Sequence, residues 1–215
     1  MKKKLLIYVF IAMFLFVNLS FSQKKDEGYI QTAYNAILKK DYKTAITNYT
    51  LALEKFKGYA PTYYGRGLAY TYLDQYQDAI GDFSKAIELN ANYHQAYYGR
   101  GLAYYKTSDM TNAISNFTSA IAAEPKESDY YYARAIAYYQ QKNFESALVD
   151  YNKAIELNPK NGVAFYGRAV VNKILNRKQD AINDFTTYIQ LNDDKDGLQN
   201  EVYRLIAETK EEEEK

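Results

Sequence analysis

Along most of the chain, hydrophobic residues recur among polar ones at the spacing of amphipathic helices. Between positions 76 and 89 the apolar residues are Tyr76, Ala79, Ile80, Phe83, Ala86 and Ile87. Gaps of three, four and seven residues place these side chains on one face of a helix. The segment before it, with Tyr63, Gly67 and Tyr70, lacks strand-like alternation and predicts a second helix. The join near Asp74 is short, so the two helices are expected to be antiparallel.

This two-helix pattern repeats along the chain. Arg66, Arg100, Arg134 and Arg168 follow one another at intervals of 34 residues, each within a phrase such as Tyr97-Tyr98-Gly99-Arg100-Gly101. A strict period of this length indicates a stack of similar units, each too small to bury its own core. Such stacks usually serve as binding surfaces, which lowers the expectation of catalysis.

Small and aromatic residues recur at fixed places in every unit. The fullest series is Tyr97, Gly101, Tyr104, Ala113, Phe117, Ala120 and Pro125, and the next is Tyr131, Ala135, Tyr138, Ala147, Tyr151, Ala154 and Pro159. This series resembles the tetratricopeptide repeat family. The resemblance covers roughly residues 26–195 and implies an all-α, right-handed α-solenoid of about five helix-turn-helix repeats. We place the repeats at about 26–59, 60–93, 94–127, 128–161 and 162–195, in one domain over 23–215.

The chain departs from the family pattern at two places in each unit. The turn, usually glycine, carries Lys40, Asp74, Ser108, Lys142 and Asn176. Because Asp and Asn tolerate left-handed dihedrals better than Lys, the two lysine turns are expected to differ in detail.

Arginine stands where the family commonly has leucine, and it varies together with a residue of the second helix. Asp82, Asp150 and Asp184 share one place in three of the arginine-containing units, and Asn116 takes it in the fourth. The first unit lacks both the arginine and the aspartate. This predicts partly buried Arg–Asp pairs between the two helices, in preference to an arginine row that binds anionic ligands.

The N-terminal segment has the pattern of an export signal. Lys2, Lys3 and Lys4 precede an apolar run from Leu5 to Val17, and Ser20-Phe21-Ser22 follows. These features predict a signal peptide over residues 1–22, cleaved to leave Gln23, and a periplasmic or extracellular protein of bacterial type. The alternative is an uncleaved anchor in the inner membrane, although the run is short for a span of about 20 residues.

The C-terminal segment, residues 196–215, predicts a cap for the stack followed by an acidic tail. Asp196 and Gly197 are expected to start a helix with Leu198, Val202, Leu205 and Ile206 on one stripe. A one-sided helix of this kind shields the open end of a solenoid. Glu211 to Glu214 are expected to be solvated rather than to form a cation site.

Composition excludes several classes of function. Without the three signal lysines the chain has 24 basic and 26 acidic residues, and no basic stripe suggests nucleic acid. The chain has no cysteine and one histidine, His94, so no metal, cofactor or disulfide is expected. We predict a surface or capping role for His94. No catalytic triad, phosphate loop or singled-out carboxylate pair is present, which predicts a protein that is not an enzyme.

The family resemblance implies that the first helix of each repeat lines a concave, peptide-binding groove. The places carried over are Tyr64, Leu68, Tyr72, Gln95, Tyr98, Leu102, Tyr105, Lys106, Asp129, Tyr132, Ile136, Tyr139, Gln140, Tyr166, Val170 and Lys173. Tyr64, Tyr98, Tyr132 and Tyr166 form a ladder with one tyrosine per repeat. Each follows a core aromatic residue and is expected to point away from the core. Capture of a C-terminal carboxylate is disfavoured, because Ile30, Tyr64 and Tyr98 stand where that mode uses lysine.

These expectations favour an exported, non-catalytic adaptor that binds a peptide or protein segment in a tyrosine-lined groove. Tyrosine suits recognition because it offers a large rigid surface and one hydroxyl. Two alternatives remain: a carbohydrate-binding module that uses the same tyrosines, with the absence of tryptophan against it, and a purely structural spacer. The sequence does not identify the partner or the oligomeric state.

Overall fold

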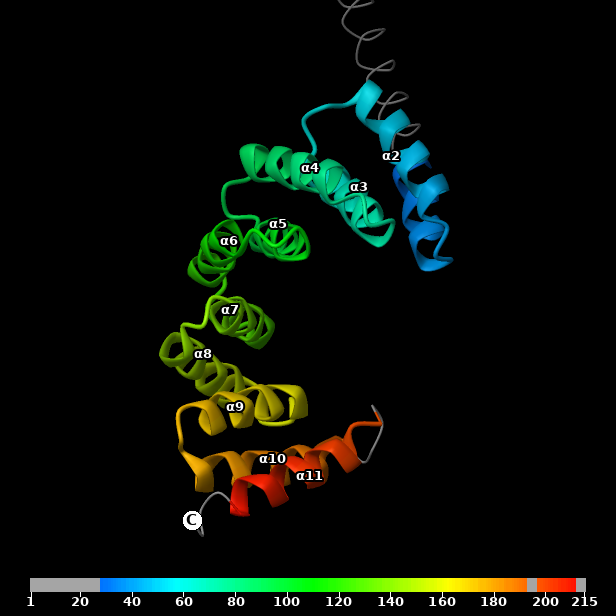
Figure 1. Cartoon of the computed structure of the whole chain (residues 1–215). Helices are drawn as coiled ribbons and strands as arrows, with labels where there is room; N and C mark the ends of the chain where they lie inside the picture. The colour runs from blue at the N-terminus through cyan, green and yellow to red at the C-terminus, as the bar shows by residue number, and fades with distance from the viewer. Residues whose placement is uncertain (1–27, 193–196, 212–215) are drawn as a thin grey trace, which may run out of the picture. The chain divides into compact units, whose positions relative to one another are not determined.

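The computed structural model describes residues 28–192 and 197–211, and all regular structure within them is helical (Figure 1). The predicted signal segment and the end of the acidic tail lie outside the described residues. Residues 28–38 form the first helical segment. The helices that follow are α2 (Tyr42–Lys55), α3 (Ala60–Tyr72), α4 (Tyr76–Leu89), α5 (His94–Lys106), α6 (Met110–Ala123), α7 (Ser128–Gln140), α8 (Phe144–Leu157), α9 (Gly162–Ile174), α10 (Lys178–Asn192) and α11 (Gln199–Glu211).

The helices form two compact units, one up to Asn92 and one from Tyr93 onward. In the first unit α3 packs against both α2 and α4. In the second unit α5 pairs with α6, α7 with α8 and α9 with α10, while α11 packs against α10. The all-α fold built from helix-turn-helix units is thus confirmed.

Small residues in the first helix of each pair allow the second helix to approach closely. An added Cβ at Gly67 would lie 2.9 Å from the Phe83 ring, and one at Gly101 would lie 2.6 Å from the Phe117 ring. Ala135 and Ala169, at the corresponding places, have no exposed surface. These contacts explain why a small residue recurs at this place in each unit. Since real Cβ atoms do not approach that closely, larger residues here would force the paired helices apart.

The turns inside the pairs are all alike, so the expectation that the lysine turns differ is wrong. Lys40, Asp74, Ser108, Lys142 and Asn176 have φ between 57° and 62°. At the fourth turn the Lys142 N–H donates to the Tyr139 carbonyl and the Asn143 N–H donates to the Tyr138 carbonyl, both at 2.9 Å. This is a Schellman ending, in which two closing hydrogen bonds require the left-handed residue whatever its type.

The last helix begins later than the sequence indicated. Gly197 has φ +70°, a left-handed value, and lies before the helix, which starts at Gln199. Three of the four residues of the predicted apolar stripe are packed. Val202 is fully buried, and Leu205 and Ile206 pack against the apolar cluster that contains Phe185 of α10. The fourth, Leu198, precedes the helix and is 36% exposed. Thr209 extends the buried stripe by one turn.

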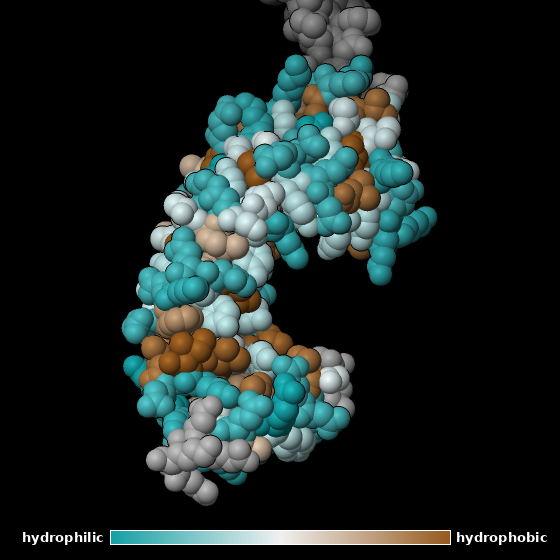
Figure 2. All heavy atoms as spheres, viewed as in Figure 1, coloured by the Kyte–Doolittle hydropathy of each residue, from teal (hydrophilic) through white to brown (hydrophobic). Residues whose placement is uncertain are grey.

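Within the described residues, none of the helices combines the length and the apolar character needed to cross a membrane. Exposed apolar side chains are instead spread over several helices, and Figure 2 shows hydrophilic side chains between the apolar patches of the viewed face.

Candidate functional site

Arg66, Arg134 and Arg168 each tie together three helices. The Arg134 Nε and Nη2 atoms of α7 donate to the two carboxylate oxygens of Asp150 in α8, at 2.7 and 2.8 Å. The Arg134 Nη1 atom donates to the Thr118 hydroxyl of the preceding repeat, at 2.9 Å. We call this arrangement the arginine clamp. It recurs as Arg66 with Asp82 and Thr50, and as Arg168 with Asp184 and Asn152.

The clamps are largely buried, which makes the ion pair matter for stability. The side chains of Arg134 and Asp150 are 17% and 3% exposed. The hydrogen bond to Asp150 raises the pKa of the Arg134 guanidinium, against the opposing effect of burial. At Asp82 burial is the larger influence and raises the pKa of the carboxyl group, while the hydrogen bond from Arg66 opposes it. The aspartate carboxylates thus form structural ion pairs with the arginines, as their joint occurrence in the repeats predicted.

Arg100 differs from the other three repeat arginines because a neutral asparagine, not an aspartate, accepts its hydrogen bond. Its Nε atom donates to the Asn116 side-chain oxygen at 2.7 Å. Burial lowers the pKa of Arg100, whereas the hydrogen bond to an aspartate raises that of Arg66 and Arg134. The chain therefore contains its own comparison between a charged and an uncharged acceptor.

The ladder tyrosines do not point away from the core, contrary to the sequence expectation. The Tyr98 ring lies 5.8 Å from the Phe117 ring and 4.9 Å from the Tyr130 ring. Tyr64 packs on Phe83 at 5.8 Å, and Tyr166 on Phe185 at 5.8 Å. The ladder tyrosines are therefore half-buried against the second helices. Burial accordingly raises the pKa of Tyr64, Tyr132 and Tyr166.

In the second unit these tyrosines form part of a continuous arrangement on α5, α7 and α9. We define the tyrosine face as Tyr98, Leu102, Tyr105, Tyr132, Ile136, Tyr139, Tyr166 and Val170, all half-buried at the edges of the apolar clusters. The first helices are neighbours here, because α7 contacts both α5 and α9. Tyr105 also contributes to the raised pKa of Tyr132, and Tyr139 to that of Tyr166. The predicted Gln95, Lys106, Asp129 and Gln140 of the same helices are exposed.

The first unit holds three of the predicted groove residues, Tyr64, Leu68 and Tyr72. The Tyr72 ring is 60% exposed and stacks on Tyr42, with centroids 4.5 Å apart and planes 9° from parallel. Tyr42 was not among the sequence candidates, because it stands at the start of α2, a second helix. Its contact with Tyr72 depends on the packing of α2 against α3.

The capping helix α11 also reaches the predicted site, which the sequence reasoning missed. Lys173 Nζ lies 3.4 Å from the Glu208 carboxylate of α11. Glu201 of the same helix contributes to the raised pKa of Tyr166. Both interactions join residues about 35 positions apart with no repeat to signal them, so only the docking of α11 could reveal them.

His94 has a structural contact rather than a site of its own. Its Nδ1 atom lies 2.7 Å from the buried Tyr130 hydroxyl, and the two rings are 5.9 Å apart. Residues 28–192 and 197–211 contain no cluster of three histidine, cysteine or acidic side chains that could hold a metal ion.

Antiparallel helix pairs, recurring small residues and identical left-handed turns define a protein built from stacked helical hairpins. A family model described as tetratricopeptide repeat matches residues 60–93 and 128–161, and a second model with the same description matches residues 94–127. The chain is a tetratricopeptide repeat protein. A search of curated protein sequences gave no match.

Several solved structures share this fold. The crystal structure of MamA has a TM-score of 0.73 and 22% identity, covering 80% of this chain and 94% of its own. YrrB, described as a tetratricopeptide repeat protein with an unusual peptide-binding site, has a TM-score of 0.71 and 20% identity over 87% of this chain and 97% of its own. A tetratricopeptide repeat protein from Parabacteroides merdae has a TM-score of 0.73 and 19% identity, covering 86% of this chain and 72% of its own. At these identities the likeness establishes the fold.

Proposed function

We propose that this protein is a non-catalytic adaptor that binds an extended or helical protein segment along the tyrosine face. Proteins of this family typically act as interaction scaffolds, and YrrB is described as binding a peptide. The observation that carries the proposal is the arrangement of α5, α7 and α9 in the second unit. They supply half-buried tyrosine rings fixed against the core and exposed polar side chains beside them.

The chemistry of the tyrosine face favours a partner with little net charge. Its half-buried members are tyrosine hydroxyls and aliphatic groups, and Lys173 is already paired with Glu208. Rings held against Phe117, Tyr151 and Phe185 have lost most of their conformational freedom before binding, so contacts with them require little further ordering. Polar and aromatic peptide segments suit such a surface better than strongly acidic or basic ones.

We also propose that the protein is exported and acts in the periplasm or outside the cell. The support is the sequence pattern of residues 1–22, a basic start followed by an apolar run and small residues before the predicted cleavage site. Mass spectrometry of the protein from its native cells is expected to find Gln23 at the N-terminus. An intact Met1 in the membrane fraction would instead mean an uncleaved anchor.

The binding proposal is tested with exposed residues, because the half-buried tyrosines also support the fold. A peptide library is screened against the purified protein, and the selected peptides are titrated against a variant combining Gln95→Ala, Asp129→Ala and Gln140→Ala. We expect binding at least about tenfold weaker, a change of about 1.4 kcal/mol. The melting temperature should stay unchanged, since surface substitutions shift stability by about 0.5 kcal/mol or less.

The matched control is a variant with Glu145→Ala and Gln179→Ala, which changes equally exposed residues of the second helices α8 and α10. This control should bind as the unmodified protein does. Equal binding by both variants would remove the tyrosine face as the site. Selection of glycans in preference to peptides on a parallel array would favour the carbohydrate-binding alternative.

A further inference from the structure

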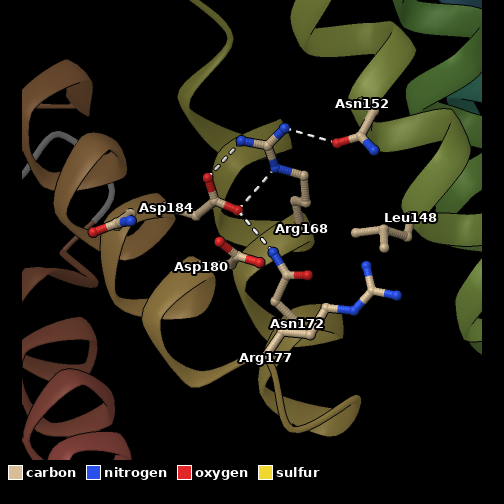
Figure 3. Close-up of a pocket in the computed structure, with 8 residues that line it drawn as sticks. Leu148, Asn152, Arg168, Asn172, Arg177, Asp180 and Asp184 are labelled. Atoms are coloured by element: carbon tan, nitrogen blue, oxygen red, sulfur yellow. Dashed lines mark hydrogen bonds and ion pairs between the residues drawn. The ribbon is translucent and has the colours of Figure 1, made fainter.

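A cavity of about 320 Å³ lies beside the arginine clamp of the fifth repeat, between α8, α9 and α10 (Figure 3). Its walls include Leu148 and Asn152 of α8, Arg168 and Asn172 of α9, Arg177 directly before α10, and Asp180 in the first turn of α10. None of these residues belongs to the tyrosine face. Its volume stands at the lower end of the range for small-ligand sites, about 300–1,000 Å³.

The earlier repeats show what usually occupies the space beside this guanidinium. In the second repeat the Arg66 guanidinium lies between the rings of Tyr63 and Tyr70, at 5.9 and 6.0 Å. In the fourth repeat Arg134 lies between Tyr131 and Tyr138, both at 5.9 Å. Each of these two clamps thus has an aromatic ring on both sides of the arginine, and cation–π attraction makes these contacts favourable.

The fifth repeat has only one of these two rings. Phe165 lies 5.4 Å from the Arg168 guanidinium, but the place of Tyr70 and Tyr138 is taken by Asn172. The buried Asn172 side chain donates to Asp184 at 3.1 Å, so the clamp is completed by a hydrogen bond and not by a ring. Because asparagine is much shorter than tyrosine, the space of the missing ring is left as part of the cavity.

We propose that this cavity binds the side chain of a tyrosine supplied by a partner polypeptide. The aromatic ring would lie against Arg168 and Leu148, in the place that Tyr138 takes beside Arg134. The site is separate from the tyrosine face and would give the protein a second point of contact with its partner.

The charges around the cavity suit a neutral group that can both donate and accept a hydrogen bond. Arg168 is neutralised by its bidentate contact with Asp184. Of the remaining charged groups, the Arg177 guanidinium lies on the Leu148 side and the Asp180 carboxylate on the Asp184 side (Figure 3). A phenol hydroxyl can accept from the first and donate to the second, which an aliphatic side chain or a phenylalanine ring cannot do.

The test uses the purified protein and N-acetyl-L-tyrosinamide as the probe, followed by NMR through the side-chain amide signals of Asn152 and Asn172. We expect saturable shifts with a dissociation constant on the order of 1 mM, as befits a ligand of this size. N-acetyl-L-leucinamide should bind at least about tenfold more weakly. No shift, equal shifts with leucinamide, or stronger shifts with glucose would overturn the proposal, the last by indicating a site for sugars.

Two variants separate binding in the cavity from binding elsewhere. Asn172→Tyr restores the family residue, fills the cavity and should abolish the shifts of Asn152. Arg177→Ala combined with Asp180→Ala changes only exposed side chains, so the fold is retained and tyrosinamide binding should weaken several-fold. Binding that survives both changes would show that the probe binds outside this cavity.

Discussion

At the scale of single residues, we expect each repeat arginine to stabilise the fold by an amount that depends on the charge of the side chain that accepts its hydrogen bonds. Arg134→Ala would leave the Asp150 carboxylate, 3% exposed, without its bidentate partner. Breaking a buried ion pair in this way destabilises by about 3–5 kcal/mol. Because Arg134 retains some solvent exposure, we expect a loss near the lower end, measured by urea unfolding.

Arg100→Ala is the matched control for that measurement. At the place of Asp150 its acceptor is the uncharged Asn116, so the substitution strands no carboxylate there and should cost only about 1–3 kcal/mol for the unsatisfied amide. A second check is Asp150→Asn, which converts the fourth clamp to the Arg100 type. If Arg134→Ala were no more harmful than Arg100→Ala, the charge of the acceptor would not decide the contribution, and only an unchanged stability of Arg134→Ala would reopen a binding role for the arginines.

The Arg–Asp pairs could be predicted from the sequence because arginine and acceptor vary together from repeat to repeat. The third contact of each clamp could not. Thr50, Thr118 and Asn152 stand sixteen residues before their arginines, but they are small polar residues without a complementary charge. The sequence of one repeat does not show that its polar side chain will contact the arginine of the following repeat. That information lies in how neighbouring repeats dock.

At the scale of elements, the repeated turns store strain that a glycine would remove. Lys142 has φ 60°, a conformation that is unfavourable for residues with a Cβ by about 1–2 kcal/mol. We expect Lys142→Gly to raise stability by about 0.5–1 kcal/mol, since the greater freedom of glycine in the unfolded chain offsets part of the gain. Thermal unfolding followed by circular dichroism would measure it.

Gln141→Gly provides the comparison, because the neighbouring Gln141 has φ −79° and no such strain to relieve. That variant should be neutral or less stable. A drop in the melting temperature on Lys142→Gly would mean that the lysine side chain contributes to the turn in a way that its backbone geometry does not explain.

Sequence reasoning succeeded for the helices and failed for the details of their ends and contacts. The apolar spacing predicted the helix pairs, because burial of one face per helix decides their existence. It did not predict that the lysine turns match the others, since the closing hydrogen bonds override residue preference. It also missed Gly65 and Gly167, where an added Cβ would lie 2.5 Å from Tyr49 and Tyr151 of the preceding helix.

At the scale of the whole molecule, the period alone was sufficient to predict the class of fold. The candidate site was less accessible to sequence reasoning. The tyrosine ladder does lie on the first helices, but its half-buried packing was not predicted. Tyr98 follows Tyr97 and points about 100° away from it around the helix, yet its ring still reaches Phe117. Substituting Tyr98 or Tyr132 would therefore lower stability as well as binding, so exposed neighbours make the better probes.

The most direct test of the proposed binding face is photo-crosslinking in the cells that make the protein. A benzophenone amino acid is introduced singly at the exposed Gln95 or Gln140 of α5 and α7, and at the exposed Ser115 or Glu145 of α6 and α8 as controls. The account predicts one crosslinked partner from Gln95 and Gln140 and none from Ser115 and Glu145. A partner captured from Ser115 or Glu145 alone would contradict it and would place the interaction on the second helices.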